Sequence, residues 1–191
     1  AQLDPLDPAN KLILSIGALA DTGLQGFSKW CVAAKSPLTG TIFRSITGGN
    51  FGVWLKRAGY DLLIIEGRAE KFSYLYLDED GVHFMDAEEL RGTDPRRLQI
   101  ILKKKHGSNT QTAGIGSAGE KLLRYAVITA GERTASRGGM GTIMGAKNLK
   151  AVCINVPAHK PEPADRSALE NLAAKQVQIL KQHPRYRNMN T

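Results

Sequence analysis

The chain has 191 residues, 42% of them hydrophobic and 23% charged, which is enough to bury the core of one ordinary domain or of two very small ones. Its most apolar run, residues 62–65, is far shorter than the roughly 20 residues that cross a bilayer, which excludes a membrane span. Two cysteines cannot build a disulfide framework or supply the four ligands of an ordinary zinc or iron–sulfur site. Because the sequence begins with alanine and stops without a recognisable ending, we expect a soluble, cytoplasmic piece of a longer protein.

The excess positive charge is concentrated in one glycine-rich stretch. The chain carries 26 basic and 18 acidic residues, for a net charge of +8. Residues 121–150 hold six cations against the single anion Glu132, so they account for +5 of that total. The stretch contains only one aromatic residue, Tyr125, and no RNA-binding, helix-turn-helix or zinc-finger pattern. A compact anion such as a phosphate is therefore favoured over nucleic acid, with a solvated basic face as the simpler alternative.

Hydrophobic periodicity predicts several short strands and few helices. The strands are expected at residues 11–16, 29–34, 62–66, 74–77 and 82–85, the last two forming a hairpin around an acidic turn. An amphipathic helix is expected from Pro95 to about Lys105. Ser167 and Glu170 form a capping-box pattern that predicts a second helix, ending near residue 182. Residues 1–156 should thus form one domain, and residues 157–191 a proline-rich linker with the start of a helical region.

An internal repeat is the most informative pattern in the sequence. Aligning Gly52 with Gly141 superposes two glycine-rich segments and the strands that follow them. The matched pairs are residues 49–55 with 138–144, 62–65 with 151–154 and, at other offsets, 16–18 with 115–117 and 29–32 with 124–127. Each copy is expected to run strand, cation-bearing strand, glycine-rich turn, short helix, strand. A pseudo-twofold arrangement of the copies would bring both turns and their cations towards one axis.

Each glycine-rich turn suits an anion, because glycine permits positive φ and close backbone approach while the following helix directs free N–H groups into the turn. Arg133 and Arg137 flank a threonine, an alanine and a serine, so guanidinium groups, hydroxyls and backbone amides could converge on phosphate oxygens. No Gly-Lys-Ser/Thr follows either turn and no GxGxxG fingerprint is present, which disfavours nucleoside triphosphates and NAD. Two helix-capping turns with exposed cations are the alternative without a ligand.

The remaining reactive side chains predict no catalytic or metal site. The four histidines are scattered and lack metal-ligand spacing. Cys31 and Cys153 lie in predicted strands and are expected to be small buried hydrophobic residues rather than nucleophiles. Nothing beyond proximity supports a catalytic role for the carboxylates of residues 78–80. From the residues alone we predict an anion-binding module without catalytic residues or metal ligands of its own.

Seven segments in a fixed order carry a family resemblance. They are residues 4–13, 35–40, 48–52, 55–61, 65–70, 115–120 and 135–152. Together they resemble the N-terminal domain of the aldehyde ferredoxin oxidoreductase family, tungsten enzymes with a bis-pterin cofactor, over about residues 4–156. The resemblance implies an internally duplicated α+β domain of mostly antiparallel sheets and short helices. On this domain the two pterins would lie with their phosphates bridged by magnesium.

The resemblance also implies a function and a set of contacts. The chain is expected to be the cofactor-holding part of a tungsten (or molybdenum) bis-molybdopterin oxidoreductase that interconverts aldehydes and carboxylic acids, with ferredoxin as electron partner. Its [4Fe-4S] cluster and catalytic residues would lie on later domains or subunits, so this chain alone should be inactive; a homodimer is a further expected partner arrangement. The residues expected to hold the pterin phosphates are Lys29, Gly48, Gly49, Arg133, Thr134, Ala135, Ser136, Arg137, Gly138 and Gly139.

Three departures from the family pattern matter. Lys29 stands where the family commonly has an arginine, which keeps the charge but loses the bidentate fork. The family's magnesium-binding asparagine falls on Ile46, whose side chain cannot bind the ion, although a backbone carbonyl near Thr134 could contribute. Residues 135–137 also resemble the benzoyl-coenzyme A reductase branch, so an aromatic acyl thioester is an alternative substrate. Another alternative is a non-catalytic phosphate- or nucleic-acid-binding module that has lost the cofactor.

Overall fold

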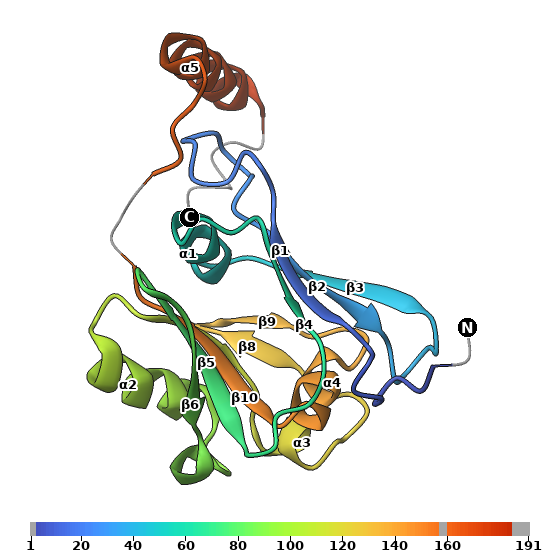
Figure 1. The fold of residues 1–191 in the computed structure, drawn as a ribbon. Helices are drawn as coiled ribbons and strands as arrows, with labels where there is room; N and C mark the ends of the chain where they lie inside the picture. The colour runs from blue at the N-terminus through green and yellow to red at the C-terminus, as the bar shows by residue number, and fades with distance from the viewer. Residues whose placement is uncertain (1–2, 157–159, 185–191) are drawn as a thin grey trace.

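Two β-sheets pack face to face in the computed structural model, which describes residues 3–156 and 160–184 (Figure 1). The first sheet has the order β3-β2-β1-β4 and the second the order β6-β5-β10-β7-β8-β9. Every strand pair is antiparallel except β5 with β10. The predicted α+β class with mostly antiparallel sheets and short helices is confirmed.

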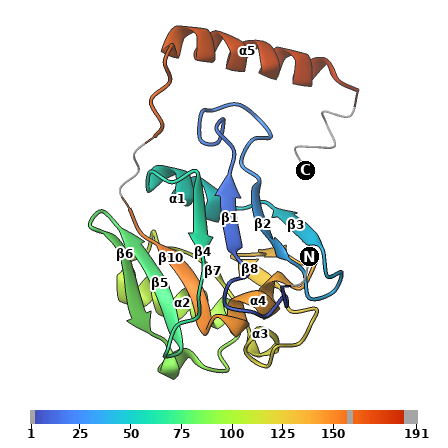
Figure 2. The same ribbon diagram turned by 45° about the vertical axis from the view of Figure 1, so that its right-hand side comes forward.

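The strands are short and the helices mostly lie at the ends of the sheets. The strands are β1 Leu12–Ile16, β2 Trp30–Lys35, β3 Ile42–Thr47, β4 Leu62–Ile65, β5 Ser73–Asp78, β6 Gly81–Asp86, β7 Gln111–Gly114, β8 Ile128–Ala130, β9 Arg133–Ala135 and β10 Leu149–Ile154. The helices are α1 Phe51–Arg57, α2 Pro95–His106, α3 Ser117–Glu120, α4 Met140–Ala146 and α5 Arg166–Gln182, with a 3₁₀ turn at Glu88–Leu90. Figures 1 and 2 show α1 near one end of the paired sheets and α4 near the other. No helix in the described part of the chain is both long and apolar enough to cross a bilayer.

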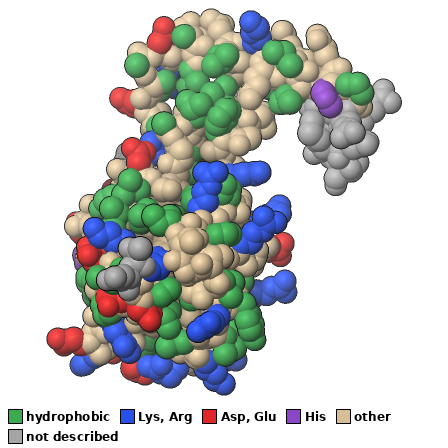
Figure 3. Space-filling model, turned by 90° about the vertical axis from the view of Figure 1, so that its right-hand side faces the viewer, with side chains coloured by type: hydrophobic (Ala, Val, Ile, Leu, Met, Phe, Trp, Pro, Cys, Tyr) green, Lys and Arg blue, Asp and Glu red, His purple; other side chains and the backbone are tan. Residues whose placement is uncertain are grey.

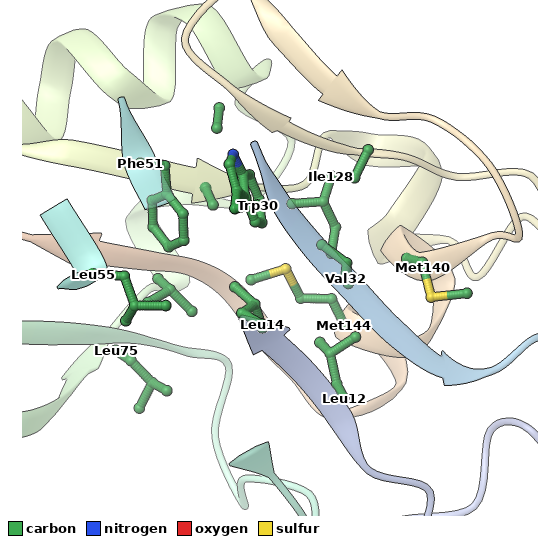
Figure 4. Packing of buried hydrophobic residues seen from close by; sticks show 14 of the residues in the cluster. Leu12, Leu14, Trp30, Val32, Phe51, Leu55, Leu75, Ile128, Met140 and Met144 are labelled. Carbon is green, nitrogen blue, oxygen red and sulfur yellow. The ribbon is translucent and has the colours of Figure 1, made fainter. Parts of the chain in front are cut away.

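The core lies between the sheets because alternate side chains of the first-sheet strands point inward. Leu12 and Leu14 of β1, like Trp30 and Val32 of β2, are almost fully buried. Trp30 packs on Phe51 of α1 with ring centroids 4.7 Å apart, as the close view in Figure 4 illustrates. All six residues of β10 are buried, because this central strand is covered on both faces. A second core cluster lies on the outer face of the second sheet, under α2.

The predicted duplication is visible in the strand order. β3-β2-β1-β4 of the first sheet corresponds to β9-β8-β7-β10 of the second, and α1 and α4 have seven residues each. The register agrees as well, because Ser15 pairs with Leu62 in the first copy and Gly114 with Ala151 in the second. Each copy contains a strand before its glycine turn that the predicted order lacked. The chain thus contains two units of the same strand order, and the second has the short helix α3 inserted between β7 and β8.

One part of the predicted repeat is wrong. The register matches Trp30 with Ile128 rather than with Tyr125, because Ser15 pairs with Cys31 and the equivalent Gly114 pairs with Thr129. Burial explains the difference: Trp30 and Ile128 are both in the core, whereas Tyr125 is 68% exposed. Lys29 therefore has no repeat partner in Arg124.

Helix α5 stands apart from the two sheets (Figure 2). A pair of hydrogen bonds between the side chain of Gln176 and the backbone of Gln25 links it to the body. The helix begins at Arg166, and its N-cap lies two residues before the predicted cap Ser167: Asp165 is the N-cap, and its carboxylate accepts a hydrogen bond from the N–H of Ala168. Pro157 and His159, at the start of the predicted linker, lie outside the described residues. The division into domains at residue 156 stays a prediction.

The cap gives a first testable expectation. Replacing Asp165 with alanine should destabilise α5 by about 1 kcal/mol, because it removes the side chain that caps the helix start. Hydrogen exchange of the helix amides is the measurement. Ser167→Ala is the matched control and should change exchange little; an equal effect of the two substitutions would contradict the assignment of the cap.

Candidate functional site

Both glycine turns lie where the two sheets meet, at the neighbouring edge strands β3 and β9. The first turn follows β3 and touches the second copy: a Cβ placed on Gly49 would be 3.3 Å from Cγ of Arg133. The second turn follows β9 and touches the first copy, where the backbone N–H of Arg137 donates to Oγ of Ser45 at 3.2 Å. The pseudo-twofold arrangement therefore brings the two turns and both arginines to one place, as the repeat predicted.

A core side chain holds the first turn in place. The indole N–H of Trp30 donates to the carbonyl of Gly48 at 3.0 Å, while Gly49 has the left-handed φ of +90°. Lys29 immediately precedes Trp30 and is exposed. Since Trp30 pairs with Thr47, Lys29 lies beside the strand end from which the first turn starts. Three of the predicted site residues thus belong to one surface.

The second turn has a buried floor and an exposed rim. Gly138 and Gly139 are buried with φ of +73° and +67°, and a Cβ on Gly139 would be 2.0 Å from the carbonyl oxygen of Arg124. Oγ of Ser36 donates to the Gly138 carbonyl at 2.8 Å. Ala135 is fully buried, so it and the two glycines offer only backbone atoms to a ligand. Thr134, Ser136 and the arginines on either side of them are exposed and form the rim.

Several hydrogen-bond donors at this junction have no acceptor among the described residues. The backbone N–H groups of five turn residues make no hydrogen bond to described protein atoms; these are Gly48, Gly49, Ser136, Gly138 and Gly139. Lys29, Arg133 and Arg137 likewise form no ion pair with described residues. Because α1 and α4 are so short, the turns and the cations, rather than a helix dipole, supply the attraction for an anion. We name this surface the β3–β9 junction.

Two lysines of the predicted basic stretch belong to the scaffold instead. The ammonium of Lys147 donates to the carbonyls of Pro8 and Gly67 at 2.8 and 2.9 Å, and burial lowers its pKa. Lys150 is fully buried and pairs with the carboxylate of Glu120. Both side chains hold loops in place, so the stretch divides into a structural part and an exposed part.

Arg44 is an exposed cation that the sequence analysis missed. It lies on β3, on the outer face of the first sheet, and its charge partly offsets the effect of burial, which raises the pKa of Cys31. Cys31 is half-buried on that face, so its predicted burial is wrong, because outward positions of this sheet have no described layer above them. Burial raises the pKa of Cys153 to about 12, which agrees with an inert core thiol. No local pattern pointed to Arg44, because the inward positions of residues 42–47 include Ser45 and Thr47 while Ile42 and Ile46 are exposed.

The histidines make local contacts rather than a metal site. His106 accepts or donates a hydrogen bond with the hydroxyl of Tyr74 at 2.8 Å and stacks on Tyr76 with ring centroids 3.9 Å apart. His83 lies 2.8 Å from the carboxylate of Asp78 across the hairpin. Within the described residues, no group of three or more His, Cys, Asp or Glu side chains is arranged to hold a metal ion.

The environment of His106 predicts a pH dependence. Burial lowers the pKa of His106 below 6.5, so under mildly acidic conditions the unfolded chain binds more protons than the folded chain. The free energy of unfolding should therefore fall as the pH drops below this value. Urea midpoints measured at about pH 7.5 and about pH 5.5 test this. His106→Gln should reduce the difference between the two midpoints; an unchanged difference would assign the pH dependence to other groups.

The structure defines an internally duplicated α+β domain whose two glycine turns meet at the β3–β9 junction. The sequence model of the aldehyde ferredoxin oxidoreductase N-terminal domain matches residues 1–156. The chain belongs to the aldehyde ferredoxin oxidoreductase family, as the resemblance implied.

Individual relatives agree with this placement. The chain is 39% identical over 184 residues to the tungsten-containing aldehyde ferredoxin oxidoreductase of Pyrococcus furiosus, a match that covers 95% of the chain and 30% of that protein. It is 40% identical over 186 residues to the enzyme of the same name from Pyrococcus abyssi, covering 96% of the chain and 30% of that protein. The chain thus spans about a third of the length of these curated relatives.

A solved structure has the same fold. The active-site complex BamBC of benzoyl coenzyme A reductase, in complex with 1,5-dienoyl-CoA, superposes with a TM-score of 0.88 at 34% sequence identity. The match covers 94% of this chain and 28% of that one. The two Pyrococcus relatives are tungsten-containing aldehyde ferredoxin oxidoreductases, and the solved structure is a complex with 1,5-dienoyl-CoA.

Proposed function

We propose that residues 1–156 hold the pterin cofactor of a tungsten (or molybdenum) oxidoreductase that interconverts aldehydes and carboxylic acids. The observation that carries the proposal is the β3–β9 junction, where two glycine turns meet two arginines, and where the turn N–H groups and the guanidinium groups have no hydrogen-bond or ion-pair partner among the described residues. A pterin dithiolene cofactor with two phosphate-bearing halves requires two equivalent anion sites. A duplicated domain whose turns meet at one junction supplies such a pair.

The residues at the junction fit the phosphates of such a cofactor. Arg133 and Arg137 would donate charge-assisted hydrogen bonds from the second copy, while Lys29 would add a point charge beside the first turn. Amides of Gly48, Gly49 and Ser136 would donate from the backbone, with the amides of Gly138 and Gly139 behind them. When bound, the tungsten–pterin group supplies the two-electron redox chemistry. This chain's own residues bind and orient it.

At the position of the family's magnesium-binding asparagine, this chain has no side chain that could hold the ion. Ile46 is 54% exposed on the outer face of β3, and its side chain has no ligating atom. The register places Thr134 at the equivalent position of β9, because Cys31 pairs with Ile46 and Thr129 with Thr134. We therefore assign magnesium no role that depends on the side chain of Ile46.

In our proposal, the other functional parts of the enzyme lie outside this chain. The iron–sulfur cluster and the substrate-binding residues would belong to further domains or subunits, with ferredoxin as the electron partner and the cytoplasm as the location. A second copy could complete a homodimer. The BamBC neighbour favours an aromatic acyl thioester as a second candidate substrate.

Metal analysis of the intact full-length protein is the decisive experiment. Protein produced with both tungstate and molybdate available is expected to contain one of the two metals together with pterin. Reduction of a dye by added aldehyde would then support the aldehyde reaction, and reaction with an aromatic acyl-coenzyme A alone would support the second candidate. Absence of both metals would refute the proposal. Salt-sensitive oligonucleotide binding by metal-free protein would favour the module that has lost its cofactor.

A further inference from the structure

Helix α2 turns one face to the core and the opposite face to solvent. Leu98 and Leu102 are fully buried in the core cluster on the outer face of the second sheet. The end of the helix is fixed as well, because the side chain of Asn155 donates to the carbonyl of His106 and the His106 ring bonds to the hydroxyl of Tyr74. Figure 1 shows the helix on the side of the molecule away from β3. The outward face of α2 is therefore a rigid surface, remote from the β3–β9 junction.

That outward face consists of one isoleucine surrounded by cations. Ile100 is 68% exposed at the middle of the helix. Its neighbours on the helix surface are the residues three and four positions away in either direction. All four neighbours are basic: Arg96, Arg97 and Lys104 are exposed, and Lys103 is half-buried. We name these five residues the α2 patch.

Helix stability explains only part of this charge. The helix dipole stabilises cations in the last turn, where Lys103 and Lys104 lie, but disfavours cations in the first turn, where Arg96 and Arg97 lie. The helix start already has a favourable anion, because the carboxylate of Asp94 accepts from the backbone N–H groups of both arginines. The helix itself contains no Asp or Glu, and none of the four cations forms an ion pair with a described residue. The two arginines thus point to an anionic group outside the described chain.

The charge of the α2 patch is concentrated and of one sign. On the face drawn in Figure 3, by comparison, Lys and Arg side chains are interspersed with hydrophobic and acidic ones. The patch has four basic and no acidic side chains on a helix of 12 residues, which is about 18 Å long. A surface of one sign attracts a partner of opposite charge and steers its approach.

The composition of the patch favours an acidic protein over other polyanions. Nucleic-acid surfaces usually add aromatic, hydroxyl or amide side chains that contact bases and phosphates, and the patch has none of these. A helix that binds a membrane turns its broad apolar face outward, whereas the apolar face of α2 is buried in the core. An apolar centre with a charged rim is the arrangement of a protein–protein interface.

We propose that the α2 patch docks reversibly onto an acidic surface of a separate protein. Carboxylates of that protein pair with Arg96, Arg97, Lys103 and Lys104, while an apolar group of the partner covers Ile100. One apolar residue among four cations suits a transient contact, because permanent interfaces are more hydrophobic. The proposal does not depend on the cofactor.

Binding of a defined acidic peptide to the full-length protein tests the proposal. The probe is a helical peptide with one leucine flanked by glutamates three and four residues away on both sides, and the same peptide with glutamines is the neutral control. Fluorescence anisotropy at about 50 mM salt measures binding under weak screening. The glutamate peptide is expected to bind at least about tenfold more tightly than the neutral peptide, and to lose this advantage at about 0.5 M salt.

Variants of the patch locate the binding. Arg96→Glu/Arg97→Glu is expected to weaken binding of the glutamate peptide by at least about tenfold. The helix should remain folded in this variant, because acidic side chains in the first turn favour the dipole and the substitution at residue 97 completes a capping box with Asp94. Ile100→Ala, at an exposed position, should weaken binding about threefold or more through the loss of apolar contact.

The matched control lies on α5. Arg166→Glu/Lys175→Glu reverses the same number of exposed helical charges and should change peptide binding by less than about threefold. Acetylation of Lys104 in the full-length protein provides a second readout. This lysine should react readily in the protein alone, and the bound glutamate peptide should slow its acetylation.

Four outcomes would overturn the proposal. They are equal binding of the two peptides, equal weakening by the double variants on α2 and α5, a Lys104 that resists acetylation in the full-length protein alone and so lies under another part of it, and tighter binding of a single-stranded oligonucleotide or an anionic phospholipid vesicle that Arg96→Glu/Arg97→Glu abolishes. Metal and pterin content are not part of the readout, so failure here leaves the proposed function standing.

Discussion

Replacing Arg133 and Arg137 together with alanine is expected to lower the affinity of the full-length protein for the proposed pterin cofactor by on the order of a hundredfold or more. Each arginine can donate charge-assisted hydrogen bonds to phosphate, worth about 1.5 to 3 kcal/mol apiece. Both side chains are exposed and form no ion pair with described residues, so their loss should leave folding almost unchanged. Pterin and tungsten per folded protein are the quantities to measure.

The control for this pair lies on α2. Arg96 and Arg97 are likewise two exposed arginines, but they stand at the start of α2, away from the β3–β9 junction. Arg96→Ala/Arg97→Ala removes the same charge and should keep the full cofactor content. If the two double variants retain equal amounts of pterin and metal, the junction is a solvated basic face and the assignment of its arginines is wrong.

Replacing Gly139 with alanine is expected to destabilise the domain by about 2 to 5 kcal/mol. A left-handed backbone costs a residue with a side chain about 1 to 2 kcal/mol, and forcing a methyl group into packed surroundings adds about 1 to 3 kcal/mol. Gly139 has both problems, since its φ is +67° and its Cβ would lie 2.0 Å from the carbonyl oxygen of Arg124. Thermal or denaturant unfolding measures the effect.

Gly131 is the matched position for that test. Its φ is +61°, close to that of Gly139, yet no atom lies within 4 Å of its Cβ position. Gly131→Ala should therefore show the backbone cost alone, about 1 to 2 kcal/mol. A similar loss of stability for both variants would mean that the backbone relaxes around Gly139 and that the close approach to Arg124 carries no penalty.

The sequence predicts those strands whose alternation follows the core, and it fails where the alternation is inverted. β1, β2 and the hairpin β5–β6 were predicted because apolar residues recur along them. β3 escaped notice because its inward positions hold Ser45 and Thr47, while Ile42 and Ile46 point outward. Serine fills this place because its hydroxyl accepts a hydrogen bond from the second glycine turn. That requirement comes from a partner 92 residues away, which no local pattern contains.

The candidate site, like the strands, could be predicted from the sequence only in part. The glycine turns and the arginines between them were identifiable because glycine and cations together are uncommon in a core. The sequence did not show why individual glycines are needed. Gly52 lets its helix approach Trp30, and Gly141 lets its helix approach the Val127 carbonyl. Such neighbours depend on the whole fold. Lys147 and Lys150 could not be separated from the exposed cations either, because only the folded chain buries them.

Each half of the β3–β9 junction is held in shape by the other half. Ser36 and Ser45 of the first repeat unit hold the second turn through the Gly138 carbonyl and the Arg137 amide, while the second unit's Arg133 packs on Gly49. Neither unit can therefore present its turn correctly before the other has folded against it. A chain with one unit unfolded is therefore expected to lose the shape of both turns rather than of one.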